Sequence, residues 1–230
     1  MKQLRNQKGF TLVEIAIVLV IIGLLLGGVL KGQELIENSK VKNAVNDLNG
    51  ITAAYYGYVD RFKSIPGDDG PIATLNARGG TWATLVADGA GNNNGVLGPL
   101  LAAVTFTGQG TNDEGDAFWM QLKAAGLITG NVAAVNVAAL PPNAFNGLTG
   151  VTTDGSIMVT APATIWSGTK LCMSQVPGKS ARAIDTQIDD GVGDTGSVRN
   201  TVGASGLNTS PGVAVAAYDD DNVYTICRSL

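Results

Sequence analysis

A run of 21 residues from Phe10 to Leu30 contains a single ionisable side chain, that of Glu14. As an α-helix rising about 1.5 Å per residue, the run is about 32 Å long, which matches the roughly 30 Å hydrocarbon core of a bilayer. Three basic residues and no acidic residue precede it: Lys2, Arg5 and Lys8. Basic residues just before an apolar run favour a cytoplasmic N-terminal side. The chain is therefore expected to cross a membrane once, with its larger part on the far side.

A cleaved secretory signal is the alternative interpretation of this run. Such a signal has an apolar core of about 7–15 residues, followed by a cleavage site with small residues. The run here is longer, and Val29-Leu30-Lys31 does not provide such a site. The segment is therefore expected to stay with the protein.

The composition removes several classes of function. The 230 residues include no histidine, which excludes Ser-His and Cys-His catalysis, His-ligated zinc or haem, and an imidazole pH switch. The formal net charge is −4 and no basic stripe follows the first eight residues, so nucleic acid is not an expected partner. The 31 glycines show no three-residue period, which excludes collagen and predicts a part rich in turns.

Glu14 is anomalous because a carboxylate within a bilayer costs several kcal/mol unless it is paired or protonated. No side chain within the apolar run can pair with it. A cut between Gly9 and Phe10 would create an α-amino group four residues before Glu14. That amine is within helical reach of Glu14 in the same chain and accessible to Glu14 of a neighbouring subunit. The sequence therefore indicates processing at this bond.

The segment Lys8-Gly9-Phe10-Thr11-Leu12-Val13-Glu14 resembles the processing site of type IV prepilins and of the pseudopilins of type II secretion. The resemblance implies that a membrane prepilin peptidase cuts after Gly9 and that Phe10 becomes the methylated N-terminus. It also implies that Glu14 guides the subunit into a helical filament. Other segments, such as Ile65-Pro66-Gly67-Asp68, are similar to parts of large prepilin-type proteins, but they are less specific.

The apolar run continues into a predicted amphipathic helix. We expect a leader at residues 1–9, a membrane and filament-core half of one long helix at 10–30, an amphipathic spine at 31–63 and a head at 64–230. Apolar residues recur in the spine at steps of three and four: Val41, Ala44, Val45, Leu48, Ile51, Tyr55, Tyr58 and Phe62. Many pilins have a kinking proline at the end of the apolar run, where this chain has Gly27, Gly28 and Gly32, each of which weakens a helix by about 1 kcal/mol.

The head is predicted to be α+β, with a small antiparallel sheet, and the resemblance implies a type IV pilin-like fold. Short helices are expected after Asn112 or Asp113, ending at Gly126, and over 177–188. Strands are expected at 156–161, 164–172, 213–218 and 223–228, the last two forming a hairpin across Asp219–Asn222.

The two cysteines, Cys172 and Cys227, are 55 positions apart. If the head faces an oxidising compartment, as the predicted orientation requires, they are expected to form a disulfide. Two inert buried thiols are an alternative, as is a redox pair, for which the CxxC spacing is missing. In the pilin family a disulfide commonly closes the C-terminal region, and these cysteines fit that pattern.

Three carboxylates on a glycine-containing turn form a candidate calcium site: Asp189, Asp190 and Asp194. Calcium prefers such clusters of oxygen ligands, and some pseudopilins use it to order a C-terminal loop. The alternative is a solvated turn after a helix. No other cofactor is expected.

The prediction for function is a structural filament subunit and not an enzyme. The resemblance implies self-association, with prepilin peptidase and an inner-membrane assembly platform with its cytoplasmic ATPase as partners. The subunit is expected in the bacterial inner membrane, with its head in the periplasm, before it enters a periplasmic or cell-surface filament. Alternatives are a minor pilin or adhesin at the tip, a type II secretion pseudopilin, or an anchored enzyme that uses Asp189 or Asp190.

Overall fold

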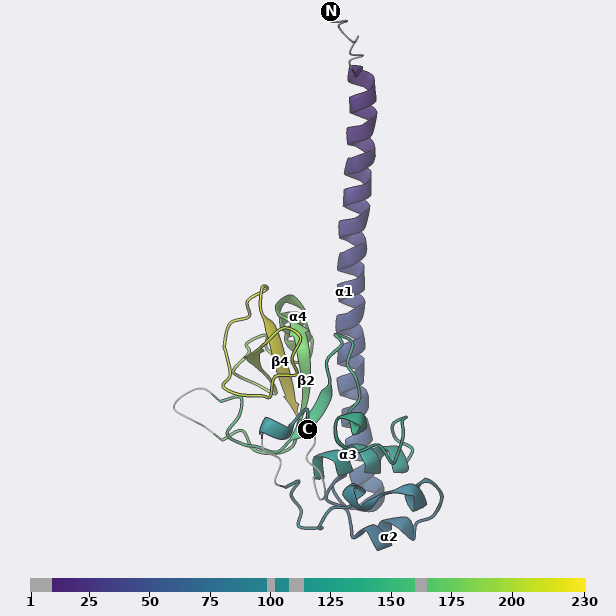
Figure 1. Ribbon diagram of the computed structural model, residues 1–230. Coiled ribbons are helices and arrows are strands. Elements are labelled where there is room, and N and C mark those ends of the chain that lie inside the picture. Colours follow the sequence, from purple (N-terminus) through teal and green to yellow (C-terminus); the bar gives the residue numbers. More distant parts are fainter. Residues whose placement is uncertain (1–9, 99–101, 108–113, 160–164) are drawn as a thin grey trace, which may run out of the picture. The chain divides into compact units, whose positions relative to one another are not determined.

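The computed structural model describes residues 10–98, 102–107, 114–159 and 165–230. The chain divides into two compact units between Ser39 and Lys40. Helix α1 (Leu12–Phe62) contributes its first part to one unit and its second part to the other. It runs without interruption through Gly27, Gly28 and Gly32 (Figure 1), so the single long helix expected from the sequence is confirmed.

The described part of the first unit, Phe10–Ser39, is almost entirely the apolar part of α1. By length and composition this helix can cross a membrane, and no residue in its most apolar stretch is buried. A helix is suited to lipid because it satisfies its backbone hydrogen bonds internally.

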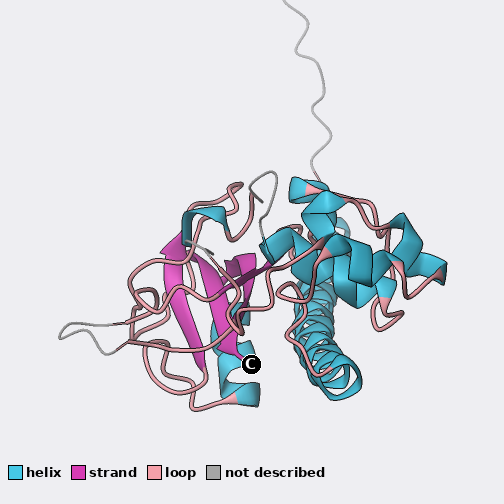
Figure 2. Ribbon diagram, turned by 90° about the horizontal axis from the view of Figure 1, so that it is seen from below, coloured by secondary structure: helices cyan, strands magenta, loops and turns pink. Residues whose placement is uncertain are grey.

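The second unit, Lys40–Leu230, combines short helices with one sheet (Figure 2). Its α-helices are the second part of α1, α2 (Ile72–Asn76), α3 (Glu114–Ala124) and α4 (Gly178–Ile188). Short 3₁₀ helices lie at Gly80–Thr84, Ala87–Gly89, Ala102–Val104 and Asn136–Ala139. The strands are β1 (Thr149–Thr152), β2 (Lys170–Pro177), β3 (Val198–Gly203) and β4 (Val223–Ser229). They form an antiparallel sheet in the order β1-β2-β4-β3, which confirms the α+β class.

The predicted spine stripe supplies one side of the core. The buried residues of α1 are Val41, Ala44, Leu48, Ile51, Ala54 and Tyr58, which recur at helical spacing. They belong to a single hydrophobic cluster with residues of α3 and of the sheet. Helix α3 is buried along its whole length, so its polar side chains need partners inside the protein.

The strand predictions were partly wrong. No strand forms at 156–159, and residues 160–164 lie outside the described residues. The second strand begins at Lys170, not at 164. Residues 213–218 form no strand and no hairpin with β4, because β4 pairs with β2 and β3 instead. The segment nevertheless lies along β3, where Val215 N donates to the carbonyl of Asn200.

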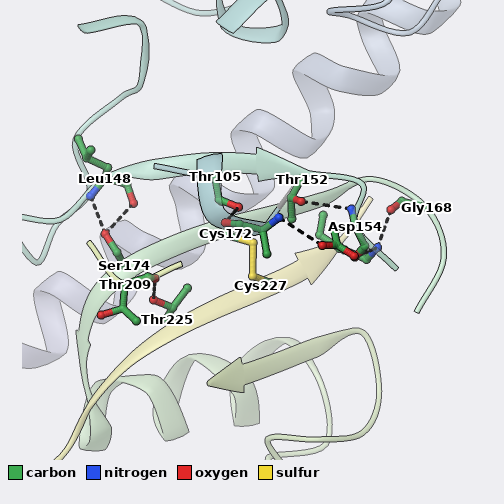
Figure 3. Close-up of a disulfide and its surroundings, with 12 residues drawn as sticks. Thr105, Leu148, Thr152, Asp154, Gly168, Cys172, Ser174, Thr209, Thr225 and Cys227 are labelled. Atoms are coloured by element: carbon green, nitrogen blue, oxygen red, sulfur yellow. Dashed lines mark hydrogen bonds between the residues drawn. A yellow bond between two sulfur atoms is a disulfide. The ribbon is translucent and has the colours of Figure 1, made fainter. Parts of the chain in front are cut away.

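Cys172 of β2 and Cys227 of β4 form a disulfide, as the sequence predicts (Figure 3). The two residues are directly opposite each other in the strand register. Both are buried. The disulfide therefore links the two central strands within the core, where it closes a segment of 55 positions.

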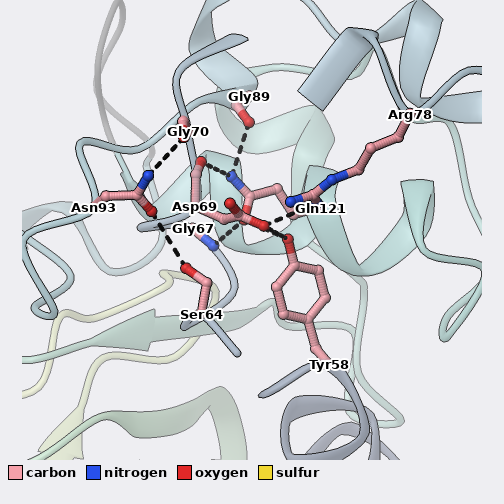
Figure 4. Close-up of polar contacts among 9 residues, drawn as sticks. All are labelled: Tyr58, Ser64, Gly67, Asp69, Gly70, Arg78, Gly89, Asn93 and Gln121. Carbon is pink, nitrogen blue, oxygen red and sulfur yellow. Dashed lines mark hydrogen bonds and ion pairs between the residues drawn. The ribbon is translucent and has the colours of Figure 1, made fainter. Parts of the chain in front are cut away.

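A buried polar network joins the end of α1 to α3 (Figure 4). The Tyr58 hydroxyl is 2.7 Å from Asp69 Oδ2 and 3.2 Å from Gln121 Oε1. Gln121 also accepts from Gly67 N at 2.6 Å, and its Nε2 donates to the carbonyls of Asp69 and Gly89. Two backbone groups in the turn after α1 and one at Gly89 are therefore bonded to one side chain.

Arg78 completes this network from the outside. Its Nη1 is 2.9 Å from Asp69 Oδ2. Its guanidinium lies 4.6 Å from the ring centroids of both Phe62 and Trp82.

Gly67 has a φ of +96°, and a Cβ there would be 2.5 Å from the carbonyl oxygen of Glu114. The turn after α1 therefore requires glycine at this position.

Replacing Gln121 with Leu should lower the free energy of unfolding by about 2 kcal/mol, because the Gly67 amide and the Gly89 carbonyl lose their partner at about 1 kcal/mol or more each, while the Asp69 carbonyl keeps the Gly91 amide as a donor. Urea unfolding of the full chain in detergent, followed by tryptophan fluorescence, measures this. Gln187→Leu on the exposed side of α4 is the matched control and should be nearly neutral. Equal losses for both variants would show that the network contributes nothing specific.

Lys170 predicts an unusual pH dependence. Its side chain is buried, and Nζ donates to the carbonyls of Asp154 and Gly168. Burial lowers the pKa of Lys170 to about 8 from 10.5. The unfolded chain then binds more protons than the folded one between these two values, so stability should rise with pH across this window. Comparing urea unfolding at pH 7 and pH 9.5 tests this, and Lys170→Met should show a smaller rise than the wild type.

Candidate functional site

The N-terminus of α1 holds the first candidate site. The helix begins at Leu12, and Phe10 and Thr11 lie before it. Phe10 is 83% exposed. Gly9, the other residue of the predicted cleavage site, lies outside the described residues. The structure thus places Phe10, the predicted N-terminal residue after cleavage, just outside the helix, two positions before the helix starts.

Glu14 forms reciprocal hydrogen bonds with Thr11. The Thr11 amide and its hydroxyl both donate to Glu14 Oε2 at 2.8 Å. The Glu14 amide is 3.3 Å from Thr11 Oγ1, which accepts from it. This is a capping box, in which the residue before the helix and the third helical residue satisfy each other's amides.

Thr11 is a residue whose contribution the sequence analysis missed. The signal was present, because Thr followed three residues later by Glu before an apolar run is the sequence pattern of a capping box. The consequence is that the Glu14 carboxylate has two neutral donors within its own chain. A charged partner is still absent among the described residues of this helix end.

The acidic loop after α4 is the second candidate site. The structure brings together Asp185, Asp189 and Asp190, with one oxygen of each within 4.8 Å of the others. Asp194 is not a member of this group. Asp185 was not predicted from the sequence, because it lies within α4, one helical turn before the loop.

Hydrogen bonds within the protein already engage these carboxylates. Asp189 Oδ2 accepts from the amides of Ser197 and Val198 at the start of β3. Asp190 accepts from the Thr195 hydroxyl and the Val192 amide, which lower its pKa. The carboxylates therefore shape the loop through the chain's own donors, and calcium binding stays a prediction.

Asp185 differs from its neighbours in being fully buried. Its Oδ2 accepts from the Tyr218 hydroxyl at 2.7 Å. Burial raises the pKa of Asp185, and the nearby charges of Asp189 and Asp190 add to this effect. A divalent cation would oppose these effects, since an opposite charge favours the ionised form.

Replacing Asp189 with Ala should cost about 2 kcal/mol of stability, because two amides at the start of β3 lose a charged acceptor. Asp194→Ala is the matched control and should be nearly neutral.

Thermal unfolding with and without millimolar calcium also tests the metal prediction. Calcium bound at this loop should stabilise the wild type and Asp194→Ala, but not Asp189→Ala. A calcium effect that survives Asp189→Ala would place the ion elsewhere.

The N-terminal part of the chain matches a known family model. The family model described as the prokaryotic N-terminal methylation motif matches residues 4–30. This is the prepilin-type cleavage and methylation motif of type IV pilins and pseudopilins. Comparison with curated proteins gives no match. The long apolar helix followed by a head with a four-stranded antiparallel sheet also matches the α+β type IV pilin fold.

Proposed function

We propose that the protein is the precursor of a structural subunit of a type IV pilus or pilus-like filament. The observation that carries the proposal is the methylation motif at residues 4–30, which includes the apolar first part of α1, where every residue is exposed. Such a motif points to a structural subunit and not to an enzyme. The subunit is anchored in the membrane until it enters the filament.

Processing removes residues 1–9 and leaves Phe10 as a methylated N-terminus. Prepilin peptidase is the partner for this step. An inner-membrane platform with its cytoplasmic ATPase then moves the subunit from lipid into the filament. Apolar helices that bundle together keep their side chains away from water during this transfer, so the 21-residue run remains in a dry environment throughout.

Glu14 supplies the assembly contact in this proposal. In the single chain its carboxylate accepts from the neutral amide and hydroxyl of Thr11. The Phe10 amine of a neighbouring subunit is a charged donor, and an opposite charge beside a carboxylate favours its ionised form, most of all in a low-dielectric environment. Entry into the filament therefore improves the environment of Glu14.

Intact mass spectrometry on filaments sheared from cells, beside the membrane fraction, tests the proposal. We expect an abundant sheared species that begins at methylated Phe10 and has both cysteines oxidised. A processed species that is scarce or confined to the cell envelope would instead indicate a minor pilin or a pseudopilin. An uncleaved chain would overturn the proposal.

Glu14→Ala should be processed normally and should assemble at least about 10-fold less well, because the gain in charge pairing at this depth is lost. Glu14→Gln keeps an acceptor for Thr11 and removes the charge, so it should assemble as poorly as Glu14→Ala. Glu34→Ala, outside the apolar run, is the control. Normal filament yield from Glu14→Gln would show that the charge of Glu14 has no role in assembly.

A further inference from the structure

An open groove lies along the second part of α1, within the unit Lys40–Leu230. Its volume is about 360 Å³. One wall is α1, and the other consists of the turn after α3, two prolines and the start of β1. The lining includes Asp47, Gly50 and Ile51 of α1, and Leu127 and Ile128 of the turn after α3.

The groove combines an apolar lining with one carboxylate. Ile51, Leu127 and Ile128 supply apolar surface, and Asp47 supplies the charge. Gly50 leaves the α1 wall open, because no atom lies within 4 Å of a Cβ built there. The groove can therefore accept a side chain with an apolar stem and a cationic end, such as lysine.

The charge of Asp47 is uncompensated within the described chain. Asp47 is exposed, its side chain forms no hydrogen bond and no ion pair with any described residue, and partial desolvation raises its pKa. Lys42 on the same helix is exposed and has no described side-chain partner either. At about 100° per residue, Lys42 lies about 140° around the helix from Asp47. The two charges therefore cannot meet within one chain, but they are presented on different sides of it.

We propose that this groove binds Lys42 of a second copy of this chain, with the Lys42 ammonium paired to Asp47. The inference rests on the proposed function in one respect, since subunits inserted in the same membrane with the same orientation have parallel α1 helices. A neighbour shifted by five residues along the helix axis, about 7–8 Å, brings its Lys42 level with Asp47. Because the two contact surfaces differ, the contact repeats from copy to copy and builds a helical filament.

Charge exchange tests the contact in the full-length protein, expressed in cells that lack the wild-type copy. Asp47→Lys and Lys42→Glu should each lower the yield of sheared filaments about 10-fold, since like charges placed opposite each other are strongly unfavourable. The double variant Asp47→Lys/Lys42→Glu should return the yield to within about 2-fold of the wild type, because the pair is restored with reversed polarity.

Two further variants separate this contact from general effects of charge or folding. Lys40 lies seven residues before Asp47, on the same side of the helix, whereas the proposed partner Lys42 lies on a different side. Asp47→Lys should therefore not be rescued by Lys40→Glu. Gly50→Leu fills the groove without changing charge and should also lower filament yield. Processed subunit in the membrane fraction, with Cys172 and Cys227 oxidised, confirms that each variant folds.

The outcomes distinguish this inference from the proposed function. If the wild type is not processed or forms no filaments, the proposed function fails. If the wild type assembles and Asp47→Lys assembles equally well, the groove contact is wrong. If both single variants lose filaments and the double variant is not rescued, the groove binds something other than Lys42 of a second copy, and the inference is overturned.

Discussion

Helix α1 combines a part with apolar side chains all around it and a part that packs against the head through one face. The rest of the structure depends on this constraint. From Leu12 to Leu30 the helix carries apolar side chains on every side, with Glu14 as its one ionisable residue, and from Val41 onward only one stripe is apolar and buried. Backbone hydrogen bonds closed within the helix allow both parts to share one continuous element. The single stripe then fixes which side of α1 the head covers. All the packing of the head begins from those few buried positions.

The head is fastened at two places by different kinds of interaction. At the end of α1, Tyr58 and Gln121 connect the helix to the turn that follows it and to α3. In the sheet, Cys172 and Cys227 join the two central strands covalently. The first depends on complete hydrogen bonding in a buried site, where one missing partner is costly. The second restricts the unfolded chain and does not depend on solvent exclusion.

The sequence predicted the features that local patterns encode. The α1 stripe, the existence of α3 and the pairing of Cys172 with Cys227 follow from periodicity, turn chemistry and compartment. Helix α3 ends at Ala124, two residues before the predicted end at Gly126, and its predicted caps, Asn112 and Asp113, lie outside the described residues. The strands β1 and β3 were missed because they are short, and because β3 is specified by its neighbours: Asp189 receives the amides at its start and β4 provides its ladder. Val213–Tyr218 has the composition of a strand, yet it lies at the edge of β3 without strand geometry. The acidic group was only partly predicted, since Asp185 joins it from the last turn of α4, one helical turn before Asp189.

The polar groups of α1 differ in how completely one chain satisfies them. Tyr58 has two acceptors within the head, and Glu14 has only the neutral donors of Thr11. Asp47 has no partner among the described residues. Under the proposed function, the decrease in the number and strength of partners from Tyr58 to Glu14 to Asp47 has a physical reason. Groups satisfied within one chain hold the subunit together before assembly, while groups left with weak partners or none gain most when a second copy arrives. A subunit that satisfied every charge alone would have less to gain by leaving the membrane.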